Sequence, residues 1–228
     1  MIELKNVTKY FRTNVGRKYI LNDVTMTLPD GNIGILGRNG AGKSTLIRML
    51  GKIEFPQKGR IASAETFSWP LAISSGFVGT MTGESNVKFV CQLYGKSDQE
   101  RREITKFVKN FSELDEYFTM PIKTYSSGML ARLNFGLSLA FDFDYLLIDE
   151  TLSVGDARFR VKAKEMLREK IEHSQILLVS HDMNMLRELC HTGILLEGGK
   201  LYYFDHINDA IKAYTDINKR SDSHEDAI

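Results

Sequence analysis

The stretch GRNGAGKST, residues 37–45, places three glycines, one lysine and two hydroxyl side chains between two apolar segments, NIGIL (32–36) and LIRML (46–50). The first segment is short and typical of a strand, and the second predicts a helix over 43–50. Glycines let the backbone curl so that successive N–H groups point inward and cradle phosphate oxygens. The helix that follows directs the positive end of its dipole to the same place. The pattern predicts a polyphosphate-binding turn, and the alternative is a glycine-rich turn without a ligand.

Apolar segments elsewhere in the chain indicate the sheet around this turn. IGIL (33–36), YLLI (145–148) and ILLVS (176–180) are apolar at every or nearly every position, as in a parallel sheet covered by helices on both sides. Alternation over 2–7 and 20–28 predicts antiparallel strands near the N-terminus. The sequence therefore predicts an α/β fold with a mostly parallel sheet and an N-terminal antiparallel β-subdomain.

Helical patterns occupy much of the remaining sequence. Apolar residues recur at i, i+3, i+4 and i+7 over 99–111, and helices are also predicted over 127–141, 157–171 and 206–217. Glu197-Gly198-Gly199-Lys200 predicts a hairpin. We expect one domain over 1–218, with a helical subdomain of about 75–141 inserted into its core. The polar stretch 219–228 is expected to be a disordered tail.

Composition narrows the function classes. The chain has 228 residues, 43% of them hydrophobic, and a formal net charge of +1. This charge does not favour nucleic acid as a partner, since nucleic-acid binders usually carry a basic excess. No apolar run approaches the roughly 20 residues that span a bilayer, and no signal core is present. The two cysteines, Cys91 and Cys190, lack metal-ligand spacing, so we expect reduced, structural thiols.

Two acidic residues end the predicted strand 145–148. Ligands of open α/β sheets gather at the carboxyl ends of the strands, where Asp149 and Glu150 fall. Asp149 is predicted to hold Mg²⁺ together with Ser44, and Glu150 to activate water as a general base. The alternative is that the two acids cap the next helix.

Two further segments carry polar residues at the start of a helix or the end of a strand. TYSSGM (124–129) opens the helix predicted over 127–141, where free N–H groups make either an anion site or an ordinary N-cap at Ser126 or Ser127. His181 follows the strand 176–180 and can donate to a phosphate or to water, although taken alone it favours an ordinary loop histidine.

The order of these motifs resembles the nucleotide-binding subunit of ATP-binding cassette (ABC) transporters. GRNGAGKST, TYSSGM, YLLIDE, SVGD and VSHD follow one another along nearly the whole chain. The resemblance implies a P-loop NTPase core, ATP and Mg²⁺ as cofactors, and two copies paired head to tail. The signature motif of one copy then closes over the γ-phosphate held by Lys43 of the other.

The resemblance also implies roles for particular residues. Glu150, His181 and Lys43 would be catalytic, and Ser44 and Asp149 would hold the metal. The nucleotide-binding set consists of Phe11, which stacks on adenine; the loop Gly37, Arg38, Asn39, Gly40, Ala41, Gly42, Lys43, Ser44 and Thr45; the signature residues Ser126, Ser127 and Gly128; and Asp156 of the D-loop. Tyr10 and Tyr19 are alternatives to Phe11, and a core role remains open for all three. Val78 falls where the family usually has a metal-binding glutamine, so no ligand is assigned there.

A narrower resemblance concerns the cargo. MPIKTYSSGM, SWPLAISSGF, TGESN and VGDARF are similar to the ATPases of capsular polysaccharide exporters of Gram-negative bacteria. This implies ATP-driven export across the inner membrane, with the chain on the cytoplasmic face, a homodimer of cassettes, and a separate permease in two copies. Further cell-envelope export proteins are possible partners, and the cargo is contacted only indirectly. O-antigen or teichoic acid export is the alternative, followed by a soluble cassette ATPase, a small-molecule kinase and a regulatory nucleotide-binding subunit.

Overall fold

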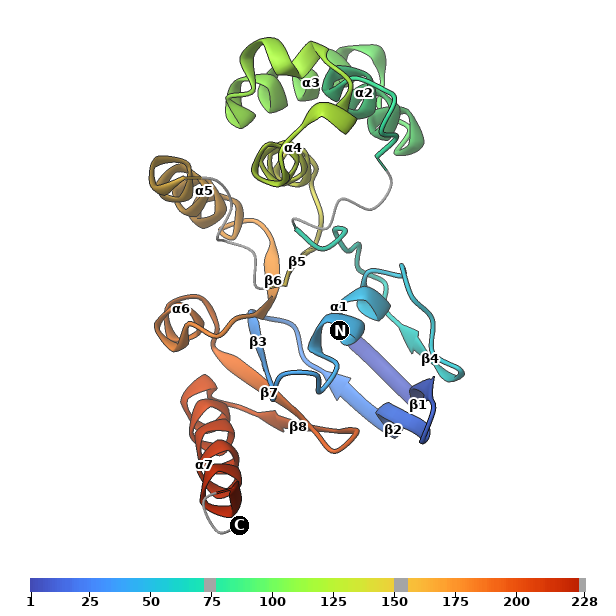
Figure 1. Ribbon diagram of the computed structural model, residues 1–228, viewed down its shortest axis with the longest axis vertical. Coiled ribbons are helices and arrows are strands. Elements are labelled where there is room, and N and C mark those ends of the chain that lie inside the picture. The colour runs from blue at the N-terminus through green and yellow to red at the C-terminus, as the bar shows by residue number, and fades with distance from the viewer. Residues whose placement is uncertain (72–76, 150–155, 226–228) are drawn as a thin grey trace. The chain divides into compact units, whose positions relative to one another are not determined.

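The computed structural model describes residues 1–71, 77–149 and 156–225 (Figure 1). The chain forms two compact units. The first contains Met1–Pro70, Phe143–Glu150 and Gln175–Ile228, and the second contains Leu71–Asp142 and Thr151–Ser174, in each case as far as the residues are described. Each unit is considered by itself below.

A five-stranded sheet forms the centre of the first unit. Its order is β5 (Tyr145–Asp149), β6 (Gln175–Val179), β3 (Ile33–Leu36), β7 (Thr192–Glu197) and β8 (Lys200–Phe204). The first four strands are parallel and β8 is antiparallel to β7. The turn between β7 and β8 has positive φ at Gly198 and Gly199, as two-residue hairpins require. The predicted mostly parallel sheet and this hairpin are confirmed.

Both faces of the central strand β3 are covered. Ile33 and Ile35 point to one face and join a core with α1 (Lys43–Leu50) and the N-terminal strands. Gly34 points to the other face, where a Cβ would lie 2.7 Å from Ile207 and 2.9 Å from Leu186. These two side chains belong to α7 (Ile207–Glu225) and α6 (Met183–Leu189). The continuous apolar sequence of the strand thus reflects burial on two sides.

The N-terminal strands form a separate antiparallel sheet in the order β2 (Gly16–Leu28), β1 (Ile2–Thr13) and β4 (Lys58–Ala62). Strands β1 and β2 pair from Ile2↔Leu28 to Thr13↔Gly16, so both are longer than the sequence predicts. Strand β4 was not predicted. The Asn22 N–H of β2 donates to the Gly199 carbonyl at 2.8 Å, which connects this sheet to the β7–β8 hairpin.

The second unit is helical. It contains α2 (Gly83–Leu93), α3 (Asp98–Ser112), the short 3₁₀ turns η1 (Asp115–Thr119) and η2 (Ile122–Thr124), α4 (Ser127–Leu139) and α5 (Ala157–Lys170). Helix α3 begins with a capping box in which Ser97 and Glu100 satisfy each other's backbone N–H groups. The predicted helical subdomain of 75–141 therefore also includes α5, because Phe159 packs against Phe111 of α3 at 5.4 Å between ring centroids.

Helix boundaries differ from the sequence prediction mainly at the C-terminus. Helix α7 continues to Glu225, so much of the stretch 219–228, expected to be a disordered tail, is helical. Helix α6 was not predicted, although Asp182 caps it by accepting from the Asn184 and Met185 N–H groups. Among the described residues, no helix is both long and apolar enough to span a membrane.

Burial should make both thiols unreactive in the folded chain. Cys91 is fully buried, Cys190 is 3% exposed, and burial raises the pKa of the Cys190 thiol to about 12 and also raises that of Cys91. Because the thiolate is the nucleophile, we expect both thiols to resist a disulfide-exchange reagent at pH 8 and to react when urea unfolds the chain. Fast reaction of either thiol in the native protein, counted by absorbance, would contradict this burial.

Candidate functional site

Three strand ends of the first unit meet in one row. Ile35 of β3 pairs with Val179 of β6, and Val179 pairs with Asp149 of β5. The loop that begins at Gly37 therefore leaves the sheet beside the segment that carries His181, and Asp149 ends the next strand along the same edge. The carboxyl edge of the sheet brings together the phosphate loop, the first carboxylate of YLLIDE and the histidine, as predicted for ligand sites of open α/β sheets.

The phosphate loop depends on glycine at two close approaches. Gly37 has φ +157°, and a Cβ there would lie 2.6 Å from the Leu196 carbonyl oxygen of β7. Gly42 has φ +109°, and its Cβ would lie 2.3 Å from Cγ2 of Ile20 on β2. Any larger residue would force either the strands or the loop to move. These contacts fix the path of the backbone between β3 and α1.

Lys43 is held by the same loop. Its side chain is almost buried, and its Nζ donates to the Gly37 carbonyl at 2.8 Å and to the Arg38 carbonyl at 3.3 Å. Gly42 is the N-cap of α1 and supplies no side-chain cap, so no side-chain cap accepts from the first N–H groups of this helix. The loop therefore combines a positioned ammonium with a helix N-terminus.

The cavity beside this loop measures about 620 Å³, which falls within the roughly 300–1,000 Å³ typical of small-molecule sites. The residues that line it come from the two N-terminal strands, the loop, α1 and the segment after β6: Phe11, Lys18, Ile20, Asn39, Gly40, Gly42, Lys43, Ser44, Thr45 and His181. None of these residues is acidic. The cavity therefore favours a polyanion.

The structure brings together most, but not all, of the predicted site residues of the first unit. Gly37, Arg38 and Ala41 shape the loop but do not line the cavity, and Asp149 lies at the end of β5, which β6 separates from β3. Phe11 lines the cavity, whereas Tyr10 and Tyr19 pack on each other at 5.5 Å between centroids. Sequence reasoning missed Lys18 and Ile20, whose i, i+2 spacing on β2 was the available signal.

The predicted general base, Glu150, lies outside the described residues, so its role stays a prediction. Val78 is described: its backbone N–H donates to Asn86 Oδ1 at 2.8 Å, and its carbonyl accepts from Asn86 Nδ2 at 3.2 Å. Asn86 is fully buried, so this loop residue is held through its backbone and not through its side chain.

The signature helix α4 lies in the second unit. Ser126 is its N-cap, with its Oγ accepting from the Met129 N–H at 3.2 Å, whereas Ser127 is the first helical residue and is exposed. A Cβ at Gly128 would meet nothing closer than 3.9 Å. The structure thus assigns the cap to Ser126 and leaves open space at the start of the helix.

Asp156 begins α5 and is tied to α4. Its carboxylate accepts from the Phe159 N–H at 2.9 Å and from Arg132 at 2.8 Å, and these contacts hold the pKa of Asp156 below its usual range. The Arg132 guanidinium lies 4.7 Å from the centroid of the Phe159 ring. The D-loop aspartate is thereby anchored to the signature helix within one unit.

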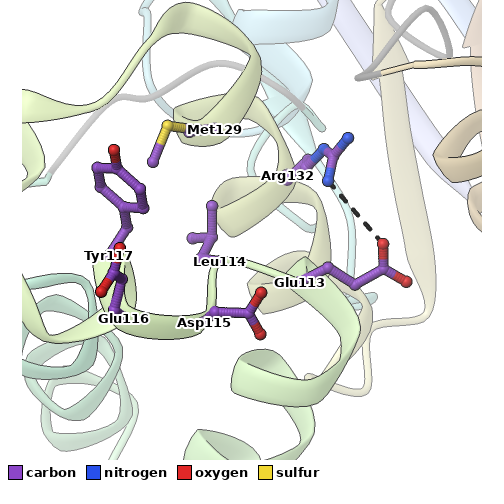
Figure 2. A pocket seen from close by; sticks show the side chains of 7 residues that line it. All are labelled: Glu113, Leu114, Asp115, Glu116, Tyr117, Met129 and Arg132. Carbon is purple, nitrogen blue, oxygen red and sulfur yellow. Dashed lines mark ion pairs between the residues drawn. The ribbon is translucent and has the colours of Figure 1, made fainter.

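The same arginine borders a second cavity, shown in Figure 2. Arg132 and Glu113 form an ion pair at 3.9 Å, and Glu113 also binds Lys162 at 2.7 Å, which lowers the pKa of Glu113. Leu114, Tyr117 and Met129 contribute apolar atoms to its lining, and Asp115 and Glu116 contribute carboxylates. This cavity lies beside the first turns of α4 and contains none of the predicted site residues.

The geometry of the first unit defines a phosphate-loop nucleotide-binding protein, in which a glycine-rich turn, a positioned lysine and an acidic strand end share one sheet edge. The family model described as "ABC transporter" matches residues 21–153, and the chain belongs to this family. The resemblance in the order of the motifs is confirmed.

Several known proteins of this family are similar to the chain over nearly its whole length. The chain is 46% identical over 216 residues to "Polysialic acid transport ATP-binding protein KpsT" of Escherichia coli, covering 94% of this chain and 96% of that one. It is 45% identical to "ATP-binding protein BexA" of Haemophilus influenzae over 220 residues, covering 96% and 100%. The solved post-hydrolysis dimer of the cassette MJ0796 has a TM-score of 0.75 at 21% identity, covering 91% and 99%, which confirms the fold.

Ser126 and Ser127 should differ in their effect on stability. Ser126→Ala removes the acceptor for the Met129 N–H and should lower the free energy of unfolding by about 1 kcal/mol. Ser127→Ala makes the same chemical change one residue later and should stay within about 0.5 kcal/mol of the parent chain. Urea unfolding followed by circular dichroism measures both, and Ser126→Asp should restore the cap. Equal losses for the two alanine variants would show that Ser126 is not the cap.

Proposed function

We propose that this chain is the ATP-binding and ATP-hydrolysing subunit of a transporter that exports a polysaccharide, with capsular polysaccharide as the cargo. The observation that carries the proposal is the cavity of the first unit, whose wall combines the phosphate loop, Phe11 and His181 without any acidic residue. The polysaccharide assignment is supported by the relatives named above. Export of O-antigen or teichoic acid is the alternative, supported by 38% identity to "Teichoic acids export ATP-binding protein TagH" of Staphylococcus saprophyticus.

ATP would enter this cavity with its phosphates at the loop. The N–H groups of the first turn of α1 would bind the phosphate oxygens, and Lys43 would exchange its two loop carbonyls for the β- and γ-phosphates. Phe11 is 42% exposed and would stack its ring on adenine, and the Lys9 ammonium lies 5.4 Å from the centroid of the same ring. The remaining loop residues, Gly37 to Thr45, hold the backbone in the shape that the phosphates require.

The residues present fit a magnesium ion held jointly with the nucleotide. Ser44 and Asp149 offer hydroxyl and carboxylate oxygens, the hard donors that Mg²⁺ takes. Over the described residues there is no group of three or more His, Cys, Asp or Glu that could enclose a metal. This suits an ion that is bound by one or two protein oxygens, phosphate and water. When bound, it neutralises charge on the β- and γ-phosphates.

Hydrolysis would require a second copy of the chain. In this proposal Ser126, Ser127 and Gly128 at the start of α4 bind the γ-phosphate held by Lys43 of the other copy, and Asp156 lies at the seam. Glu150 orients water for in-line attack and His181 stabilises the charge that develops. Loss of the γ-phosphate contacts then reopens the dimer. The dimeric state of the structural relative MJ0796 supports two copies.

The motion would be passed to a separate membrane subunit, present in two copies. Residues 77–94, which include α2, carry exposed apolar side chains at Val78, Leu93 and Tyr94, suited to such a contact. The chain would then lie at the cytoplasmic face of the bacterial inner membrane as a peripheral subunit, in contact with the cargo only indirectly. Further cell-envelope export proteins would complete the pathway, and nucleic acid is not a partner.

Lys43→Ala should weaken nucleotide binding. A charge-assisted hydrogen bond contributes about 1.5–3 kcal/mol, which corresponds to roughly 10- to 100-fold in Kd. Titration with a fluorescent ATP analogue measures this, and the exposed Lys212→Ala serves as the control that removes the same charge from α7. Equal affinities for the two variants would place the nucleotide elsewhere.

Glu150→Gln should keep ATP binding and lose turnover. In the complex with the membrane subunit, release of free phosphate should fall at least about 100-fold and polysaccharide export should stop, because general-base catalysis typically supplies 10²–10⁴-fold. Glu165→Gln, an exposed position on α5, is the matched control. Unchanged phosphate release would remove Glu150 as the base, and transfer of the phosphate to a metabolite would identify a kinase instead.

A further inference from the structure

The wall of the nucleotide cavity contains a second lysine, on β2. Lys18 is the cross-strand partner of Phe11 in the β1–β2 ladder. Partners across an antiparallel pair project from the same face of the sheet. Both residues line the cavity of the phosphate loop. The hairpin thus supplies an aromatic ring from one strand and an ammonium group from the other to the same space.

Lys18 reaches the loop itself. Its Nζ lies 3.5 Å from the position that a Cβ would occupy on Gly40. Throughout the part of the chain that the structure describes, Lys18 forms no salt bridge. Its ammonium therefore adds to the positive charge of Lys43 and of the α1 N-terminus on a wall without acidic residues.

We propose that Lys18 is a phosphate-binding residue that holds the phosphate chain of a nucleoside polyphosphate from β2, beside the phosphate loop. This inference rests on the proposed function, since it places the nucleotide in the same cavity. The flexible four-carbon stem lets the ammonium reach the phosphates while Phe11, beside it, contacts the base. A bound nucleotide then connects the N-terminal hairpin to the phosphate loop.

The neighbouring arginine provides a matched control. Arg17 precedes Lys18 on β2, so its side chain leaves the opposite face of the strand. Its guanidinium lies 4.7 Å from the centroid of the Tyr10 ring, and it does not line the cavity. Replacing Arg17 removes one positive charge from the same hairpin without touching the phosphate loop.

The test compares Lys18→Met, Lys18→Arg and Arg17→Met by titration with a fluorescent ATP analogue and by competition with ATP and ADP, at several salt concentrations. Methionine keeps most of the apolar stem and removes the charge. We expect Lys18→Met to weaken ATP and ADP about three- to tenfold and to reduce the salt dependence of the affinity. Lys18→Arg should restore most of the binding, and Arg17→Met should bind as the parent chain does.

Three results would overturn the inference. Lys18→Met could bind with unchanged affinity and salt dependence, Arg17→Met could lose as much affinity as Lys18→Met, or Lys18→Arg could fail to restore binding. The Lys43→Ala variant separates this failure from failure of the proposed function. If Lys43→Ala weakens binding and Lys18→Met does not, only the role of Lys18 is wrong; if the parent chain does not bind ATP, the proposed function itself is wrong.

Discussion

The structure depends on two close backbone contacts at the turn between β3 and α1. Gly37 lies against the Leu196 carbonyl of β7, and Gly42 lies against the Ile20 side chain of β2. One contact comes from the parallel sheet and the other from the antiparallel sheet. The loop is therefore shaped by both sheets at once, and glycine is required because a Cβ would overlap atoms at both positions. A preorganised loop of this kind does not have to be reordered when a phosphate binds.

The lysine of this loop shows how the chain keeps a nearly buried cation. Burying a charged group is costly unless it is hydrogen-bonded. The carbonyls of Gly37 and Arg38 provide these bonds, and they belong to the same turn that the glycines shape. Backbone conformation and electrostatics are thus coupled, since a change in the path of the loop would also remove the acceptors for Lys43.

In the helical unit, an ion pair between Arg132 and the N-cap residue Asp156 connects the starts of α4 and α5. Ser126 caps α4, Asp156 caps α5, and Arg132 bridges from the second turn of α4 to Asp156. Arg132 is 18% exposed and lies over the Phe159 ring, whereas Asp156 is 66% exposed, so water screens this ion pair on the Asp156 side. A pair with one exposed partner adds little to stability. The contact of Arg132 with both Asp156 and the Phe159 ring nevertheless joins the starts of α4 and α5.

The sequence by itself determined the features that depend on local backbone requirements. Glycine spacing predicted the phosphate loop, apolar runs predicted the parallel strands, and the residues around 198–199 predicted the hairpin. These features could be predicted because each depends on residues that are close together along the chain. Phe11 was proposed from the family resemblance, and its place in the cavity agrees with that proposal.

Only the tertiary structure decided which residues far apart in the sequence line the same cavity or pack together. Lys18 and Ile20 belong to the cavity because the register of β1 and β2 turns their face toward the loop. Alternation along one strand shows that two faces exist but not which of them meets another element. Likewise, α5 joins the helical unit through Phe159 and Phe111, a contact between residues 48 positions apart in sequence (159 − 111) that no local pattern encodes. Long-range packing depends on how well two surfaces from distant segments fit together, and the sequence of either segment alone does not predict that fit.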